Sequence, residues 1–226
     1  MGYTGELIDN MNKPRHYIEA CRYKNIVYLR TLKCASTFFY WNFTKNLNWQ
    51  EIAWSEIDWA NDHVFTHMLE PVQRRHKALA ERLAMFGLCE QYLADANLRE
   101  CLEHALILDQ HSESYTTRYG SACQHIDWIP LQSDNNHNIK LTELLLAKNG
   151  VSDIKWDYGF SHPAENNKKQ VELLLSQTWD LALYQGRLLE WQQNHMQADL
   201  DLYADVVAGV DLHGVDWGAI SWLRNK

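Results

Sequence analysis

The distribution of apolar and polar residues between positions 26 and 46 predicts a buried strand that leads directly into a helix. Residues 26–32, IVYLRTL, are largely apolar and rich in residues that favour strands, which is typical of a strand covered on both faces of a parallel sheet. Ser36 or Thr37 then stands where the helix cap is expected. The next turns have an inward face of residues at helical spacing, namely Phe38, Trp41 and Lys45, with Phe39 and Phe43 alongside.

Two further strands are predicted, each followed by a helix. Residues 63–69 form the second strand, and Pro71 begins a helix whose apolar side holds Val72, Leu79, Leu83 and Phe86. Residues 124–132 form the third strand, which Pro130 ends early, and residues 139–148 form the helix after it. A further helix is predicted over residues 90–108. A surface loop is predicted over residues 151–167, before a long helix over residues 168–193.

The alternation of strands with helices indicates an α/β protein, a three-layer sandwich of helices around a mostly parallel central sheet. A chain of 226 residues and 26.5 kDa is long enough for one sizeable core, and no internal repeat or linker divides it. We therefore expect a single domain over residues 1–226.

Charge and cysteine content limit the partners and the compartment. The formal net charge of −8, from 21 basic and 29 acidic residues, argues against a general nucleic-acid binder, so any anion site must be local. The five cysteines are odd in number and form no CxxC pair, which indicates a reducing compartment rather than a zinc site or a complete disulfide framework. No apolar run approaches the about 20 residues of a membrane helix, and residues 1–16 lack the apolar core of a signal peptide, so no membrane association is expected.

The turn between the first strand and its helix is a candidate anion site. The end of a buried parallel strand and the start of a helix together offer unpaired backbone N–H groups and the positive end of the helix dipole. Lys33 adds a mobile charge, and Ser36 and Thr37 add hydroxyl donors. Cys34 and Ala35 are small enough for close backbone approach. A second interpretation remains open, in which Lys33 is a solvated lysine and Ser36 a plain N-cap.

The same turn does not match the Walker A loop, GxxxxGK[ST], because no glycine occurs between Gly5 and Gly87. The missing glycines and the lack of a clear magnesium-binding aspartate after a strand disfavour an atypical P-loop kinase. We retain that kinase as an alternative to be tested with magnesium and ATP.

Lys33-Cys34-Ala35-Ser36-Thr37 after a buried strand resembles the 5′-phosphosulfate loop of the PAPS-dependent sulfotransferases, especially their carbohydrate and heparan sulfate branch. Variants of Pro-Lys-x-Ala/Gly-Ser/Thr-Thr/Ser occur there, and Leu32 here takes the place of the usual proline. The resemblance implies a P-loop NTPase-like fold, PAPS (3′-phosphoadenosine 5′-phosphosulfate) as donor, PAP as product, no required metal, and an acceptor hydroxyl on a carbohydrate or other small molecule. Golgi members of the family carry a membrane anchor, and since this sequence shows none, we expect a cytoplasmic protein.

A second family element is partly matched. In the family a strand ends in Arg-Asp-Pro, and a downstream arginine and serine hold the 3′-phosphate of the donor. In FTHMLEPVQRRHKAL the proline is Pro71 and the downstream arginine is Arg74, but Leu69 replaces the first arginine and Lys77 replaces the serine. Lys77 lies one helical turn from Arg74, so the two are expected to supply positive charge together.

Three later stretches are similar to further family elements and follow the same order. Asp109 and His111 match an Asp-x-His segment, and residues 124–151 match the strand, loop and helix after it. Residues 196–206, MQADLDLYADV, are similar to a closing Tyr-x-x-Asp-x-x-Leu-Tyr stretch. The resemblance spans about residues 25–207, and the first motif is the specific one.

Sulfuryl transfer needs in-line geometry and stabilisation of charge on the leaving oxygen, and Lys33 is the residue expected to stabilise it. The family also uses a glutamate or histidine as base for the acceptor hydroxyl. Glu56 and His63 are the first candidates for that base, and His67 and His111 the second. For each histidine a purely structural role is the other interpretation.

A rival from another functional class is a non-catalytic nucleotide-binding or assembly module that retains the sulfotransferase fold. Leu69 and Lys77, at the altered 3′-phosphate positions, motivate it. Trp49, Trp54 and Trp59 are interpreted as core or lid residues, with an aromatic acceptor cleft as the alternative.

Overall fold

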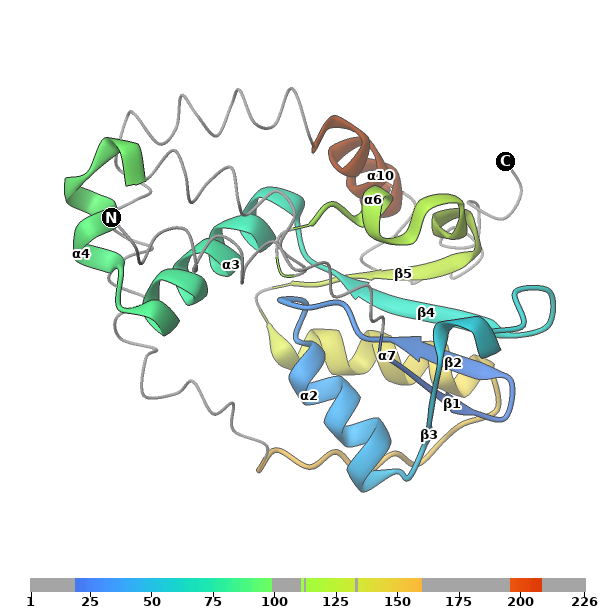
Figure 1. Cartoon of the computed structure of the whole chain (residues 1–226). Helices are drawn as coiled ribbons and strands as arrows, with labels where there is room; N and C mark the ends of the chain where they lie inside the picture. Colours follow the sequence, from blue (N-terminus) through green and yellow to red (C-terminus); the bar gives the residue numbers. More distant parts are fainter. Residues whose placement is uncertain (1–18, 99–110, 112, 133, 160–195, 209–226) are drawn as a thin grey trace. The chain divides into compact units, whose positions relative to one another are not determined.

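The computed structural model describes residues 19–98, 111, 113–132, 134–159 and 196–208 (Figure 1). Its contacts divide the chain into two interleaved compact units. The sheet unit comprises Tyr17–Glu70, Tyr119–Ser161 and Leu200–Lys226, and the helical unit comprises Met1–His16, Pro71–Arg118 and His162–Asp199. The expectation of one domain stays a prediction.

A mixed sheet of five strands, in the order β3-β1-β2-β4-β5, forms the centre of the sheet unit. The strands are β1 (Ala20–Tyr23), β2 (Ile26–Leu29), β3 (Gln50–Ile52), β4 (His63–Met68) and β5 (Ile126–Pro130). β2, β4 and β5 pair in parallel, whereas β1 is antiparallel to both of its neighbours. The α/β class is therefore confirmed, and the parallel part of the sheet consists of the three strands that the sequence predicted.

The first predicted strand ends earlier than expected, at Leu29 rather than at residue 32. The N–H of Arg30 still donates to the Glu19 carbonyl at 2.8 Å, but Thr31 no longer continues the ladder toward β4. Its hydroxyl instead contacts the Thr66 hydroxyl at 2.7 Å, and its carbonyl accepts the N–H of Cys34 at 3.2 Å. Residues 30–35 are thus a loop, which we call the anion loop after the site that the sequence predicts there.

One face of the sheet is covered by α2 (Ser36–Trp41), its π-helical continuation η1 (Asn42–Asn46), and α7 (Asn135–Lys148) (Figure 1). Side chains from these helices form one core with Tyr28 of β2, Phe65 of β4 and Ile129 of β5. Phe43 is the centre of an aromatic group, 4.4 Å from the ring of Trp49 and 4.9 Å from that of Tyr28 between centroids. The inward face predicted for the first helix is therefore confirmed at Phe39 and Phe43, which are buried, and wrong at Trp41 and Lys45, which are exposed.

The segment after α7, residues 151–159, forms neither helix nor strand, as predicted for the start of the surface loop. It is fastened to the helices that cover the sheet. The Asn42 side chain accepts the N–H of Asp157 at 2.7 Å and donates to its carbonyl at 3.1 Å. The Trp156 indole donates to Glu143 of α7 at 2.7 Å.

On the other face of the sheet, aromatic side chains come from short elements. Tyr119 ends α6 (Tyr115–Tyr119) and is followed by the 3₁₀ helix η3 (Gly120–His125). Its ring lies 5.6 Å from that of Trp128 and 6.1 Å from that of Trp54, which begins the 3₁₀ helix η2 (Trp54–Glu56). Trp54 and Trp59 are half-buried and pack edge to face at 4.9 Å.

The helical unit contains α3 (Pro71–Phe86) and α4 (Cys89–Ala94), while α6 and α10 (Gln197–Ala208) cross the boundary between the units. α3 begins at Pro71, as predicted, and ends before Gly87, whose φ of 65° only glycine adopts readily. The helix predicted over residues 168–193 lies outside the described residues. No helix in the part of the chain described here is long and apolar enough to cross a bilayer.

A series of hydrogen bonds between uncharged side chains crosses the core between the sheet and α7. Thr142 of α7 donates to the Asn138 carbonyl at 2.8 Å, so its hydroxyl must accept the proton on Nε2 of His67, 2.9 Å away. Nδ1 of His67 then accepts from the Tyr28 hydroxyl at 3.3 Å. Complete burial lowers the pKa of His67 from 6.5 to about 3, so the imidazole is neutral in the folded protein.

We predict that His67 makes stability fall with acidification. Because the pKa of His67 is about 3 in the folded state and near 6.5 in the unfolded state, unfolding takes up a proton between these values. The contribution of the neutral, buried His67 to the free energy of unfolding is therefore complete above pH 6.5 and is lost as the pH falls toward 3. His67→Gln cannot titrate, so the stability gap between wild type and variant should narrow below pH 6.5, by up to about 1.4 kcal/mol per pH unit.

Urea unfolding at a series of pH values measures this gap. At pH 7.5 the variant should be less stable, by about 1–3 kcal/mol, because buried hydrogen bonds are lost. A gap that stays constant down to pH 4.5 would contradict the buried neutral histidine.

Candidate functional site

The anion loop has an unusual backbone between β2 and α2. Lys33 has a φ of 67° and Ala35 a φ of 51°, both in the left-handed region that residues other than glycine seldom adopt. The signs of φ therefore alternate from Lys33 to Ser36, since Cys34 and Ser36 have negative values. Such alternation turns successive backbone N–H groups toward one side and forms a concavity that suits an anion.

The loop is held against the ends of two parallel strands. Cys34 is fully buried, and its sulfur accepts the N–H of Leu69, the residue after β4, at 3.4 Å. The N–H of Cys34 donates to the Thr31 carbonyl at 3.2 Å. The buried Cys34 therefore anchors the loop to the residue after β4, while Ala35 is exposed to solvent.

The helix cap differs from the prediction. α2 begins at Ser36, so Ala35 is the N-cap, and neither Ser36 nor Thr37 occupies that position. Ala35 has no side-chain oxygen, and among the described residues no side chain caps the first turn of α2 from the N-cap position. The predicted cap is wrong because the left-handed Ala35 makes the chain enter the helix one residue earlier. Ser36 is buried and Thr37 half-buried.

Five of the predicted site residues lie together in and just after this loop: Lys33, Cys34, Ala35, Ser36 and Thr37. Lys33 is half-buried, so part of its side chain is open to solvent at the carboxyl end of β2. The carboxyl ends of parallel strands are where ligands bind in open α/β sheets.

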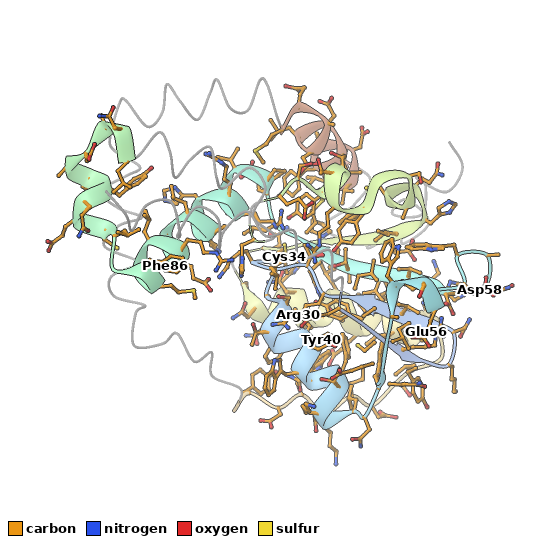
Figure 2. The ribbon with its side chains drawn as sticks, in the orientation of Figure 1. Arg30, Cys34, Tyr40, Glu56, Asp58 and Phe86 are labelled. Atoms are coloured by element: carbon orange, nitrogen blue, oxygen red, sulfur yellow. The ribbon has the colours of Figure 1, made fainter. Side chains whose placement is uncertain are left out.

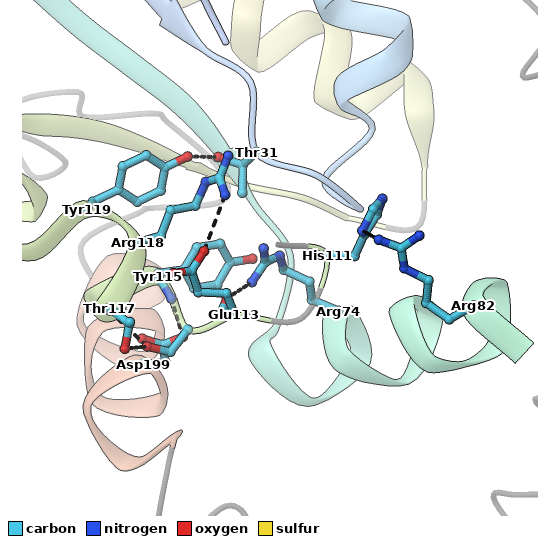
Figure 3. A network of polar contacts seen from close by, with 11 residues as sticks. Thr31, Arg74, Arg82, His111, Glu113, Tyr115, Thr117, Arg118, Tyr119 and Asp199 are labelled. Carbon is cyan, nitrogen blue, oxygen red and sulfur yellow. Dashed lines mark hydrogen bonds and ion pairs between the residues drawn. The ribbon is translucent and has the colours of Figure 1, made fainter. Parts of the chain in front are cut away.

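Arg74 and Lys77 lie on α3, in the helical unit. Arg74 is only 2% exposed, its guanidinium donates to the Glu113 carbonyl, and it lies over the Tyr115 ring at 4.6 Å (Figure 3). Lys77, one turn further along, is exposed. The two predicted phosphate ligands therefore differ in burial, and Arg74 already has other contacts.

Glu56 and His63 are not brought together with Lys33. His63 opens β4 and pairs with Ile26, the first residue of β2, so both stand at the amino ends of the parallel strands. β4 is six residues long, which places His63 about 16 Å from the other end of the strand.

Glu56 lies toward the same end of the parallel strands as His63, the amino end. Its backbone carbonyl accepts from Arg22 at 2.6 Å, and Arg22 is the partner of Val27 near the amino end of β2. The Glu56 carboxylate accepts the N–H of Ala53 at 2.6 Å. Figure 2 shows Cys34 at one end of the strands and Glu56 toward the other.

The second-rank histidines have structural surroundings. His67 is inside the core, stacked on Phe39 with 3.8 Å between ring centroids. Nδ1 of His111 lies 2.8 Å from the Arg82 guanidinium in the helical unit. Asp109 lies outside the described residues. No group of three or more metal-ligating side chains occurs in the residues that the structure describes.

Two polar residues with evident roles were not predicted as such. Asp199 is buried, and its carboxylate accepts the N–H groups of Tyr115 and Thr116 at 2.6 and 2.9 Å, so it caps the start of α6 (Figure 3). Thr31 is fully buried and contacts the hydroxyl of Tyr119 at 2.5 Å. A threonine within the apolar run of residues 26–32 is the signal that could have indicated a buried hydrogen-bonding role for Thr31.

Comparisons of the chain with protein-family models, with curated proteins and with solved structures each found no match.

We predict that Ala35→Gly leaves the free energy of unfolding unchanged or raises it by up to about 1.6 kcal/mol. Glycine removes the left-handed strain of about 1–2 kcal/mol and adds unfolded-state entropy worth about 0.4–1 kcal/mol. The matched control is Ala204→Gly, at an exposed position inside α10, which should lose about 1 kcal/mol. Equal losses in chemical unfolding of both variants would contradict the left-handed conformation of Ala35.

Proposed function

We propose that the chain is a PAPS-dependent sulfotransferase that moves a sulfuryl group to a hydroxyl of a carbohydrate or other small acceptor. The observation that carries the proposal is the anion loop, in which two left-handed residues flank Cys34 directly after a buried parallel strand. The proposal includes the finer fold, a three-layer, P-loop-like sandwich with the donor at the carboxyl ends of β2 and β4.

The loop suits a phosphosulfate for electrostatic reasons. The chain as a whole is acidic, with a formal charge of −8, so the attraction for an anion must come from local groups. Backbone N–H groups of the concave loop and of the first turn of α2 supply partial positive charge, and Lys33 supplies a full one. In this scheme the buried Ser36 contributes its backbone N–H group, and Lys33 and Thr37 contribute side chains, while the N–H of Cys34 keeps its bond to the Thr31 carbonyl.

Lys33 has the central chemical role in the proposed reaction. As the acceptor oxygen attacks the sulfur, negative charge develops on the oxygen that bridges sulfate and phosphate. An ammonium group held at that oxygen stabilises the transition state more than the ground state, which is the condition for faster chemistry. Since Glu56 and His63 lie toward the amino ends of the parallel strands, the proposal assigns the acceptor's proton to neither of them, and the proton passes to solvent water as the S–O bond to the acceptor forms and the bond to the bridging oxygen breaks.

The resemblance assigns recognition of the 3′-phosphate to Arg74 and Lys77. Arg74 donates to the Glu113 carbonyl and lies against the Tyr115 ring, which leaves Lys77 as the one of the two with an exposed side chain. Both residues belong to the helical unit and the anion loop belongs to the sheet unit, so their part in binding a 3′-phosphate stays an expectation from the resemblance. A non-catalytic module that binds a nucleotide through the same loop is the second candidate, and the engaged Arg74 together with the distant Glu56 and His63 favours it.

Calorimetric titration with adenosine 3′,5′-bisphosphate tests the donor site. We expect micromolar affinity for the bisphosphate, weaker binding of 5′-AMP and of magnesium-ATP, and loss of binding in Lys33→Ala, because the charge in the loop is removed. Lys45→Ala is the matched control, since Lys45 is exposed on η1, after the helix that follows the loop, and its Nζ lies 3.9 Å from Glu51. Absence of bisphosphate binding by the wild type would contradict the proposal, and tighter binding of magnesium-ATP would favour the kinase alternative.

Turnover separates the enzyme from the module. With PAPS and a panel of hydroxyl acceptors, release of the bisphosphate should be slower in Lys33→Ala by about 10²- to 10³-fold, by analogy with the loss of one oxyanion donor. Tight bisphosphate binding without release over the whole panel would favour the non-catalytic module.

A further inference from the structure

We infer that Tyr119 is a positioning residue for the anion loop, which it holds through a chain of buried hydroxyl groups. The hydroxyl chain consists of Tyr119, Thr31 and Thr66 and ends at the carbonyl of Leu29. The ligand of the loop rests on the proposed function, whereas the hydroxyl chain rests on contacts within the sheet unit alone.

The direction of each hydrogen bond in the chain follows from its last member. Thr66 Oγ1 donates to the Leu29 carbonyl at 2.7 Å, because a carbonyl only accepts. The single hydroxyl proton of Thr66 is then used, so Thr31 donates to Thr66 at 2.7 Å. The proton of Thr31 is used in turn, and the Tyr119 hydroxyl therefore donates to Thr31 at 2.5 Å (Figure 3).

Because the hydroxyl chain is buried, the loss of one of its hydrogen bonds should affect the conformation of the anion loop. Thr31 and Thr66 are fully buried and Tyr119 is 3% exposed, so water cannot readily replace a lost partner. Thr31 stands two residues before the left-handed Lys33, and its carbonyl accepts the N–H of Cys34. The orientation of Thr31 therefore sets how the chain leaves β2 and enters the anion loop.

The ring of Tyr119 is itself held in place. It packs edge to face against Trp128 of β5, with 5.6 Å between centroids, and lies 6.1 Å from Trp54. Because α6 ends at Tyr119, the hydroxyl comes to Thr31 from a part of the chain 88 residues away. The loop is thus braced by β4 through Thr66 and by the α6–η3 junction through Tyr119.

The first test compares Tyr119→Phe with Tyr28→Phe. Each variant removes one buried hydroxyl, but Tyr28 contacts His67 on the helix-covered face and has no part in the hydroxyl chain. In calorimetric titration with adenosine 3′,5′-bisphosphate, Tyr119→Phe should bind about tenfold more weakly, as expected for one lost buried hydrogen bond. Tyr28→Phe should stay within about twofold of wild type although it also loses stability.

The second test needs no ligand. Amide hydrogen exchange of the free protein, followed at the N–H of Cys34, should become about tenfold faster in Tyr119→Phe and remain unchanged in Tyr28→Phe. Thr31→Val should have the same effect as Tyr119→Phe, the double variant should add little to either, and Thr31→Ser should restore wild-type exchange. The Thr31 pair also carries the test if Tyr119→Phe does not fold.

The outcomes separate this inference from the proposed function. If the wild type does not bind the bisphosphate but Tyr119→Phe accelerates exchange at Cys34, the proposed donor is wrong and the role of Tyr119 in the loop stands. If exchange in Tyr119→Phe or Thr31→Val is no faster than in Tyr28→Phe, the inference is overturned whatever the ligand result. Unchanged affinity in Tyr119→Phe, with a wild type that binds, also overturns it.

Discussion

The hydrogen bond between the hydroxyls of Thr31 and Thr66 fixes the point at which the chain leaves the sheet. It joins the carboxyl ends of β2 and β4 after their ladder has stopped, and the contact between Cys34 and Leu69 does the same from the loop. Two non-glycine residues in left-handed conformations cost about 1–3 kcal/mol each and persist only where the surroundings hold them. Everything proposed for the anion loop depends on these anchors.

The strand pair β2–β4 has neutral polar groups on both of its faces. Successive residues of a strand point to opposite sides, so Thr66 reaches Thr31 on one face and His67 reaches Thr142 on the other. In a buried sheet each unpaired polar group is expensive, and these are paired in chains that end on backbone carbonyls, those of Leu29 and Asn138. Such chains penalise a shifted register, because a slip of one residue would leave all of them unpaired.

The electrostatics of the site are local rather than global. An acidic chain repels anions at long range, so a phosphosulfate would be captured by short-range groups: loop amides, the first turn of α2 and Lys33. In contrast to Lys33, the basic residue Arg74 makes its contacts within the protein. It is buried, bound to a backbone carbonyl and stacked on Tyr115, and so contributes to the structure of the helical unit.

Local pattern in the sequence was enough to predict the parallel strands, the helix from Pro71 and the strand-turn-helix that contains Lys33, because apolar periodicity and turn residues act over a few positions. It did not predict β1 and β3, because their sequences ACRY and QEI lack the continuous apolar run that indicated β2, IVYL. Strand register placed His63 away from Lys33, and the hydrogen bond from Arg22 placed Glu56 toward the same end of the strands as His63. Only tertiary structure joined Tyr119 to Thr31, since a hydrogen bond across 88 residues leaves no periodic trace in a single sequence.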